Sequence, residues 1–133
     1  HPTPLAGLQI LVVDDAADTR EFVEYLLTQS GATVTLATTA RQAFALISGG
    51  MFDVLVSDIG MPDMDGYMLI QQIRTLPPEQ GGNIPAIALT AYAGDFNQQQ
   101  AVAAGFQFHL AKPIEPDELV KAIATLVESH PQP

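Results

Sequence analysis

Cysteine and tryptophan are absent from this sequence of 133 residues. Without cysteine the chain can form neither a disulfide framework nor a cysteine-ligated zinc site. The lack of cysteine fits a reducing compartment, so we expect a cytoplasmic protein. No run of apolar residues approaches the roughly 18 that a membrane-spanning helix requires, so we expect no membrane contact.

Basic residues are scarce. Five Lys and Arg stand against 15 Asp and Glu, which gives a formal net charge of −10 at pH 7. Such an acidic surface repels phosphate backbones and anionic lipids, so direct binding to nucleic acid is not expected. The length corresponds to one domain, and the 47% of hydrophobic residues are enough for one core.

Proline marks both ends of the chain. The sequence opens with His-Pro-Thr-Pro, closes with His-Pro-Gln-Pro and has no initial Met. We therefore expect a domain cut from a longer protein, with a flexible flank over residues 1–7, a folded domain over residues 8–128 and a second flexible flank over residues 129–133.

Short apolar segments of strand length recur along the chain. Such continuous runs are typical of parallel strands that are buried on both faces. The predicted strands are Leu8–Val13, Val34–Ala37, Asp53–Asp58, Ala86–Thr90 and Phe108–Ala111.

Amphipathic helical patterns separate these strands. Capping residues and glycine or proline stops mark their ends. The predicted helices are Ala17–Ser30, a helix from the Thr39–Gln42 capping box to Gly49, Gly66–Leu76 after an Asp65 cap, a helix from Asp95 (a capping box with Gln98) to Gly105, and a helix from Pro116. Strict alternation of strands and helices predicts an α/β fold with a doubly wound parallel sheet of five strands.

Polar residues follow the predicted strands where each one ends. Asp14 and Asp15 follow the first strand, Asp58 and Thr90 end the third and fourth, and Lys112 follows the fifth. In such sheets ligands bind outside the carboxyl ends of the strands, so we expect these groups to meet there. A single Asp at such a place could equally be a helix cap, but capping explains neither the adjacent pair of acids nor the lysine.

Three clustered carboxylates repel one another unless a cation neutralises them. Mg²⁺ is the expected cation, because it prefers carboxylate, water and phosphate oxygens. A metal, a carboxylate nucleophile and a lysine together suit the formation of an acyl phosphate on an aspartate.

Four short motifs in order resemble the receiver domain of two-component response regulators. They are Leu-Val-Val-Asp-Asp at 11–15, Asp-Ile-Gly-Met-Pro at 58–62 with Asp65-Gly66, Thr90-Ala91, and Lys112-Pro113. The resemblance extends over nearly the whole chain. It implies a flavodoxin-like (βα)5 fold with strand order 2-1-3-4-5.

The resemblance also implies roles for individual residues. Asp58 would be the phosphoacceptor. Asp15 would bind Mg²⁺ directly, Asp14 would bind it directly or through water, and the Gly60 carbonyl would supply a further ligand. The phosphoryl oxygens would be held by the Thr90 hydroxyl, the Lys112 ammonium and the backbone amides of Ile59 and Ala91. A cis peptide bond is expected between Lys112 and Pro113.

One position departs from the family pattern. The residue three before Lys112, usually Tyr or Phe in receivers, is His109. His109 would either act with Thr90 as a conformational switch or be a partly buried histidine bonded to backbone. The phosphodonor would be a histidine kinase or a histidine phosphotransfer protein. A downstream protein or domain would bind the face formed by the helix from Asp95, the fifth strand and the helix from Pro116.

The segment at 104–113 resembles receivers attached to hybrid sensor histidine kinases, so the parent chain could be a hybrid kinase or a stand-alone regulator. Two other functions stay open. A receiver-like interaction module would keep the fold but never be phosphorylated. A phosphatase with an aspartyl-phosphate intermediate is less favoured. Phosphatases of the haloacid-dehalogenase type need a second acid two residues after the nucleophile, and here that position is Gly60.

Overall fold

The computed structural model describes residues 4–50, 52–91 and 95–129. The strands are β1 (Gln9–Val13), β2 (Thr33–Ala37), β3 (Val54–Asp58), β4 (Ala86–Thr90) and β5 (Phe108–Ala111). The helices are α1 (Ala17–Gln29), α2 (Ala40–Gly49), α3 (Gly66–Ile73), α4 (Asp95–Ala104), α5 (Pro116–Ser129) and the short 3₁₀ helix η1 (Pro78–Gln80). All strand pairs are parallel and their order is β2-β1-β3-β4-β5, which confirms the predicted fold.

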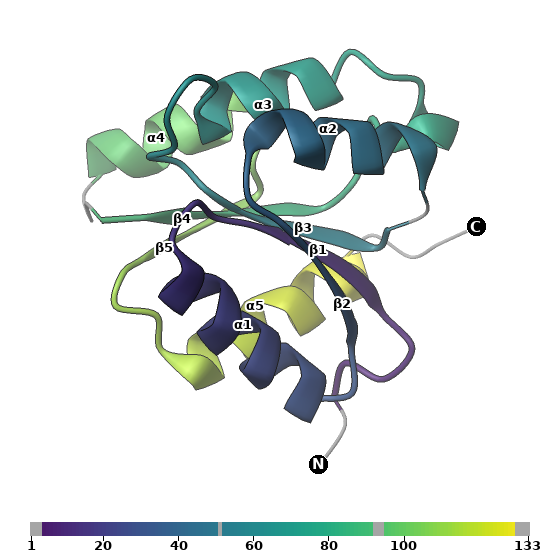
Figure 1. The fold of residues 1–133 in the computed structure, drawn as a ribbon, viewed down its shortest axis with the longest axis vertical. Coiled ribbons are helices and arrows are strands. Elements are labelled where there is room, and N and C mark those ends of the chain that lie inside the picture. The colour runs from purple at the N-terminus through teal and green to yellow at the C-terminus, as the bar shows by residue number, and fades with distance from the viewer. Residues whose placement is uncertain (1–3, 51, 92–94, 130–133) are drawn as a thin grey trace.

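Helices cover both faces of the sheet, with α2, α3 and α4 on one side and α1 and α5 on the other (Figure 1). Alternation along the buried strands divides the apolar side chains between two cores. In β1, Leu11 and Val13 belong to the core that contains residues of α2 and α3, whereas Ile10 and Val12 belong to the core that contains residues of α1 and α5. The sheet is therefore buried on both faces, and its carboxyl edge carries the polar residues.

The helix boundaries differ from the prediction at two places. Helix α3 ends at Ile73 rather than Leu76, because the chain tightens into a turn in which the Leu76 amide donates to the Ile73 carbonyl. A proline disfavours helical backbone at the residue before it, and Pro77 directly follows Leu76. Asp95 is the first residue of α4 and not the cap that precedes it.

Two predicted N-caps are confirmed. The Asp65 carboxylate accepts from the Met68 amide at 2.9 Å, and the Thr39 hydroxyl accepts from the Gln42 amide at 3.1 Å. The Gln42 side chain completes its box at Thr38 instead of Thr39, accepting from the Thr38 amide at 3.0 Å.

Packing begins inside the segment that was expected to be an N-terminal flank. Leu5 is fully buried in the core beside α1 and α5, and its amide donates to the Ser30 carbonyl at 2.9 Å. Packing against this core therefore begins before Leu8. Within the described residues, no helix combines the length and the apolar character needed to cross a membrane.

Candidate functional site

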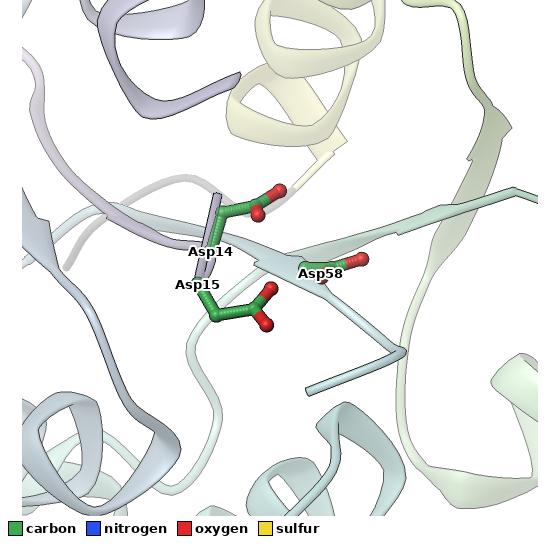
Figure 2. A group of neighbouring side chains, drawn as sticks. All are labelled: Asp14, Asp15 and Asp58. Carbon is green, nitrogen blue, oxygen red and sulfur yellow. The ribbon is translucent and has the colours of Figure 1, made fainter. Parts of the chain in front are cut away.

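Three carboxylates meet at the carboxyl edge of the sheet. Asp14 follows β1 and Asp58 ends β3, and the pairing of Val13 with Ser57 puts these strand ends side by side. Each of Asp14, Asp15 and Asp58 offers a carboxylate oxygen within 4.8 Å of the others. Figure 2 shows their side chains gathered at the ends of neighbouring strands. The sheet topology thus brings Asp58 to two acids that precede it by 43 and 44 positions in the sequence.

Lys112 joins two of these acids. Its ammonium nitrogen lies 3.2 Å from an Asp14 carboxylate oxygen and 3.1 Å from an Asp58 oxygen. The pairing of Thr90 with Ala111 brings the end of β5 to this edge, and the Lys112 amide donates to the Thr90 carbonyl at 2.7 Å. The predicted cis peptide bond between Lys112 and Pro113 is present.

Burial determines the electrostatics of this cluster. Asp14 is fully buried and Asp58 is 5% exposed. Burial and the Asp14 charge raise the pKa of Asp58, although Lys112 and a hydrogen bond from the Gly60 backbone lower it in part. Burial disfavours the charged form of Lys112, but its hydrogen bonds and attraction to Asp58 and Asp14 outweigh this and raise the pKa of Lys112. One cation therefore stands against three acids, and the site favours a second cation.

The two acids after β1 are held differently. One Asp14 oxygen accepts from the Ala16 amide at 2.8 Å and the other accepts from Lys112, so both oxygens already have protein partners. Asp15 is exposed. An exposed carboxylate beside two buried ones provides the hard oxygen donors that suit Mg²⁺.

The residues next to Asp58 leave little room around the strand end. A Cβ on Gly66 would lie 2.4 Å from the Asp58 carbonyl oxygen and 2.9 Å from the Ile59 Cα, so only glycine allows α3 to start here. The Ile59 amide donates to the Leu89 carbonyl at 3.0 Å. A contact from this amide to a phosphoryl group stays a prediction and would require that hydrogen bond to open.

Thr90 and Ala91 lie at the same edge, at the end of β4. Thr90 is 6% exposed and Ala91 is exposed. His109 lies on β5 opposite Ala88 and is partly buried. Its Nε2 atom is buried and has no hydrogen-bond partner in the described part of the chain. Nε2 therefore has no backbone partner among the described residues, and the switch role of His109 stays a prediction.

Two contacts near the site were not predicted. The Arg20 guanidinium donates to the Asp14 carbonyl oxygen at 2.8 Å. Arg41 at the start of α2 pairs with Asp63 in the loop after β3 at 2.8 Å, and Asp63 has a positive φ of 71°. Arg20 lies six residues after Asp14, but no sequence pattern distinguishes an arginine that turns back to a carbonyl from one in solvent.

Comparisons with known proteins agree with this geometry. The family model of the response regulator receiver domain matches residues 10–124. The chain is 45% identical over 119 residues to an uncharacterized 14.6 kDa protein in the sodA1 3′ region of Leptolyngbya boryana, covering 90% of this chain and 89% of the relative. It is 33% identical over 121 residues to the sensor histidine kinase RcsC of Salmonella typhi, covering 91% of this chain and 12% of that kinase.

Solved structures give the same result. The receiver domain of the sensor histidine kinase PA1611 from Pseudomonas aeruginosa, which has a magnesium ion coordinated in its active-site cleft, is 32% identical with a TM-score of 0.83, covering 92% of this chain and 99% of that one. The Vibrio cholerae chemotaxis protein CheY4 is 30% identical with a TM-score of 0.83, covering 91% of this chain and 99% of that one. The chain belongs to the family of response regulator receiver domains.

Proposed function

We propose that this domain accepts a phosphoryl group on Asp58 from the phosphohistidine of a partner, in a reaction that requires Mg²⁺. The observation that carries the proposal is the position of the Lys112 ammonium, 3.1 Å from Asp58 and 3.2 Å from Asp14, beside an exposed third acid. This arrangement combines a nucleophile with positive charge for the incoming phosphoryl oxygens.

The proposed reaction moves one phosphoryl group between two nucleophiles. A carboxylate oxygen of Asp58 attacks phosphorus, and the bond between phosphorus and the donor imidazole nitrogen breaks. The imidazole keeps the electron pair of that bond, and Asp58 becomes an acyl phosphate. Lys112 would then hold one phosphoryl oxygen, and the Thr90 hydroxyl and Ala91 amide would hold others. Later attack by water on phosphorus would return the free carboxylate and inorganic phosphate, so the domain catalyses its own phosphorylation and dephosphorylation.

The residues present fit a magnesium ion. Asp15 is the proposed direct ligand because its carboxylate is exposed, whereas both oxygens of Asp14 have protein partners and Asp14 would act through water. Asp58 and the Gly60 carbonyl would complete the protein ligands. When bound, the ion would neutralise negative charge on the carboxylates and on the transferred group.

The proposed output is a switch from Asp58 to the surface of α4, β5 and α5. Phosphorylation would draw the Thr90 hydroxyl toward Asp58 and let His109 turn inward from β5. The unpartnered Nε2 of His109 supports this proposal, because no hydrogen bond through that atom holds the ring in its present position. A downstream protein or domain would bind this surface in one of the two states.

The proposed donor is a histidine kinase or a histidine phosphotransfer protein in the cytoplasm. The chain spans 12% of RcsC and 89% of the Leptolyngbya relative, so its relatives include both a small part of a kinase and a protein of nearly its own size. Kinase activity would belong to another part of a hybrid protein or to a separate partner.

Beryllofluoride tests the proposal, because with Mg²⁺ it imitates an acyl phosphate. NMR should show amide shifts around Asp58 and along β5 in the wild-type protein. In Thr90→Ala and His109→Ala, the shifts near Asp58 should persist and those on β5 should shrink. An unchanged spectrum of the wild type would support a passive interaction module instead. Equal β5 shifts in all three proteins would remove Thr90 and His109 from the switch.

A further inference from the structure

The turn between β1 and α1 is closed in an unusual way. The residue before α1 is Ala16, which has no side chain that can cap the helix. Asp14 closes the turn ahead of the helix, where one of its carboxylate oxygens accepts from the Ala16 amide at 2.8 Å. The Arg20 side chain reaches back over the first turn and donates from Nη1 to the Asp14 carbonyl oxygen at 2.8 Å. Asp14 is thus held through both its side chain and its backbone.

The position of Arg20 is unfavourable for a cation on its own. It is the fourth residue of α1, and positive charge near a helix N-terminus opposes the helix dipole. The hydrogen bond to the Asp14 carbonyl holds the guanidinium in this position, next to the strand end that carries Asp14 and Asp15. Arg20 is partly buried, and its contact is not with an exposed carboxylate but with a backbone carbonyl.

We infer that Arg20 is a positioning residue for the metal site, which orients the Asp15 carboxylate by fixing the Asp14 carbonyl. The carbonyl of Asp14 and the amide of Asp15 share one planar peptide unit. Holding the oxygen of that unit therefore holds the Cα of Asp15 and limits where its side chain can lie. A ligand that is ordered before the metal binds loses less entropy on binding.

This inference rests on the proposed Mg²⁺ site, and it adds a residue that contacts neither the ion nor the phosphoryl group. The planar guanidinium donates in a fixed direction, whereas a lysine ammonium keeps the charge but not the direction. Arg20→Lys and Arg20→Met therefore separate orientation from charge. Lys121→Met is the matched control, because it removes one exposed cation from α5.

The experiment is a Mg²⁺ titration of the wild type, Arg20→Met, Arg20→Lys and Lys121→Met, with binding measured by calorimetry and by amide shifts in NMR. It is done at about 0.05 M and at about 1 M salt, where the screening length falls to about 3 Å. Arg20→Met should raise the Kd for Mg²⁺ about tenfold at both salt concentrations, the low end for loss of an outer-shell partner. Arg20→Lys should raise it by about threefold or more, and Lys121→Met should leave it unchanged.

A second readout needs no metal. Exchange of the Ala16 amide hydrogen should be faster in both Arg20 variants. The Asp14 carboxylate accepts from this amide, and without the Arg20 contact the turn that carries Asp14 is held less firmly. Urea unfolding without Mg²⁺ checks that each variant is folded. A wild-type Kd in Arg20→Met, or a loss that disappears at about 1 M salt, would overturn the positioning role. Failure of the wild type itself to bind Mg²⁺ would instead overturn the proposed metal site, and Asp15→Ala supplies the reference for a site without its ligand.

Discussion

Replacing Lys112 by Met would leave two buried carboxylates without their shared cation. Nζ lies 3.1 and 3.2 Å from Asp58 and Asp14, and at an effective dielectric constant of about 20 each contact contributes about 5 kcal/mol of attraction. Desolvation of the three charged groups offsets much of this. Removal of one partner from a buried pair costs about 3–5 kcal/mol, and because the Lys112 side chain is 26% exposed we expect about 3 kcal/mol.

Thermal unfolding without Mg²⁺ measures this cost. An unfolding entropy of about 2.1 cal/mol/K per residue gives about 0.28 kcal/mol/K for 133 residues, so about 3 kcal/mol corresponds to a loss of about 10 °C in Tm at pH 7. Lys121→Met, which removes an exposed cation, should change Tm by no more than about 2 °C.

The loss should depend on pH. Without Lys112, the pKa of Asp58 would rise further above its unfolded value of about 3.9. A carboxyl whose pKa is raised in the folded state destabilises the fold above that pKa, and this destabilisation disappears as the pH falls toward the unfolded value. The Tm deficit of Lys112→Met should therefore shrink between pH 7 and pH 4. A Tm close to that of the wild type at pH 7, or a deficit that grows on acidification, would refute the reasoning.

Three further predictions concern stability. Asp58→Asn should raise Tm at pH 7 without Mg²⁺, because it removes a buried charge whose pKa burial and Asp14 raise, and thermal scans should show the gain vanish near pH 4. Gly66→Ala should cost about 2 kcal/mol or more in urea unfolding, because its Cβ would lie 2.4 Å from a backbone oxygen, whereas Gly49→Ala, which meets nothing within 4 Å, should not destabilise. Arg74→Met should lower the free energy of unfolding in urea by about 2–3 kcal/mol, since it removes two guanidinium hydrogen bonds to the Gly105 carbonyl at 2.7 and 3.1 Å and one to the Gly82 carbonyl at 3.0 Å. Equal midpoints for the two glycine variants, a lower Tm for Asp58→Asn or an unchanged midpoint for Arg74→Met would each contradict its prediction.

The fold follows from the alternation of apolar strand-length runs and amphipathic helical segments, which is clear in the sequence. The strand Ala86–Thr90 has the predicted bounds because a buried parallel strand is a continuous apolar run. The gathering of Asp14, Asp58 and Lys112 was predictable for a related reason, since parallel strands place all their carboxyl ends at one edge. Both the architecture and the main site residues thus depend on pattern rather than on detailed packing.

The remaining features depend on side-chain directions that no periodicity encodes. Arg20 could extend into solvent from its helix, and only the folded turn makes the Asp14 carbonyl available to it. The ion pair of Arg41 and Asp63 joins residues 22 positions apart, one at the start of α2 and one in a loop where Asp63 has a positive φ. Leu5 lies in a proline-rich segment that has no strand or helix pattern. Its burial depends on core residues that come later in the sequence.

The most direct test of the account is the site of phosphorylation. The wild type, Asp58→Asn and Asp18→Asn would be incubated with phosphoramidate and Mg²⁺, and intact mass and peptide mapping would locate any added phosphoryl group. Asp18 is an exposed acid in the first turn of α1 and serves as the matched control. We predict one phosphoryl group, located on Asp58, in the wild type and in Asp18→Asn. Asp58→Asn should gain none, and no protein should be labelled when Mg²⁺ is chelated before the reaction. Equal labelling of Asp58→Asn, or no labelling of the wild type, would contradict the account.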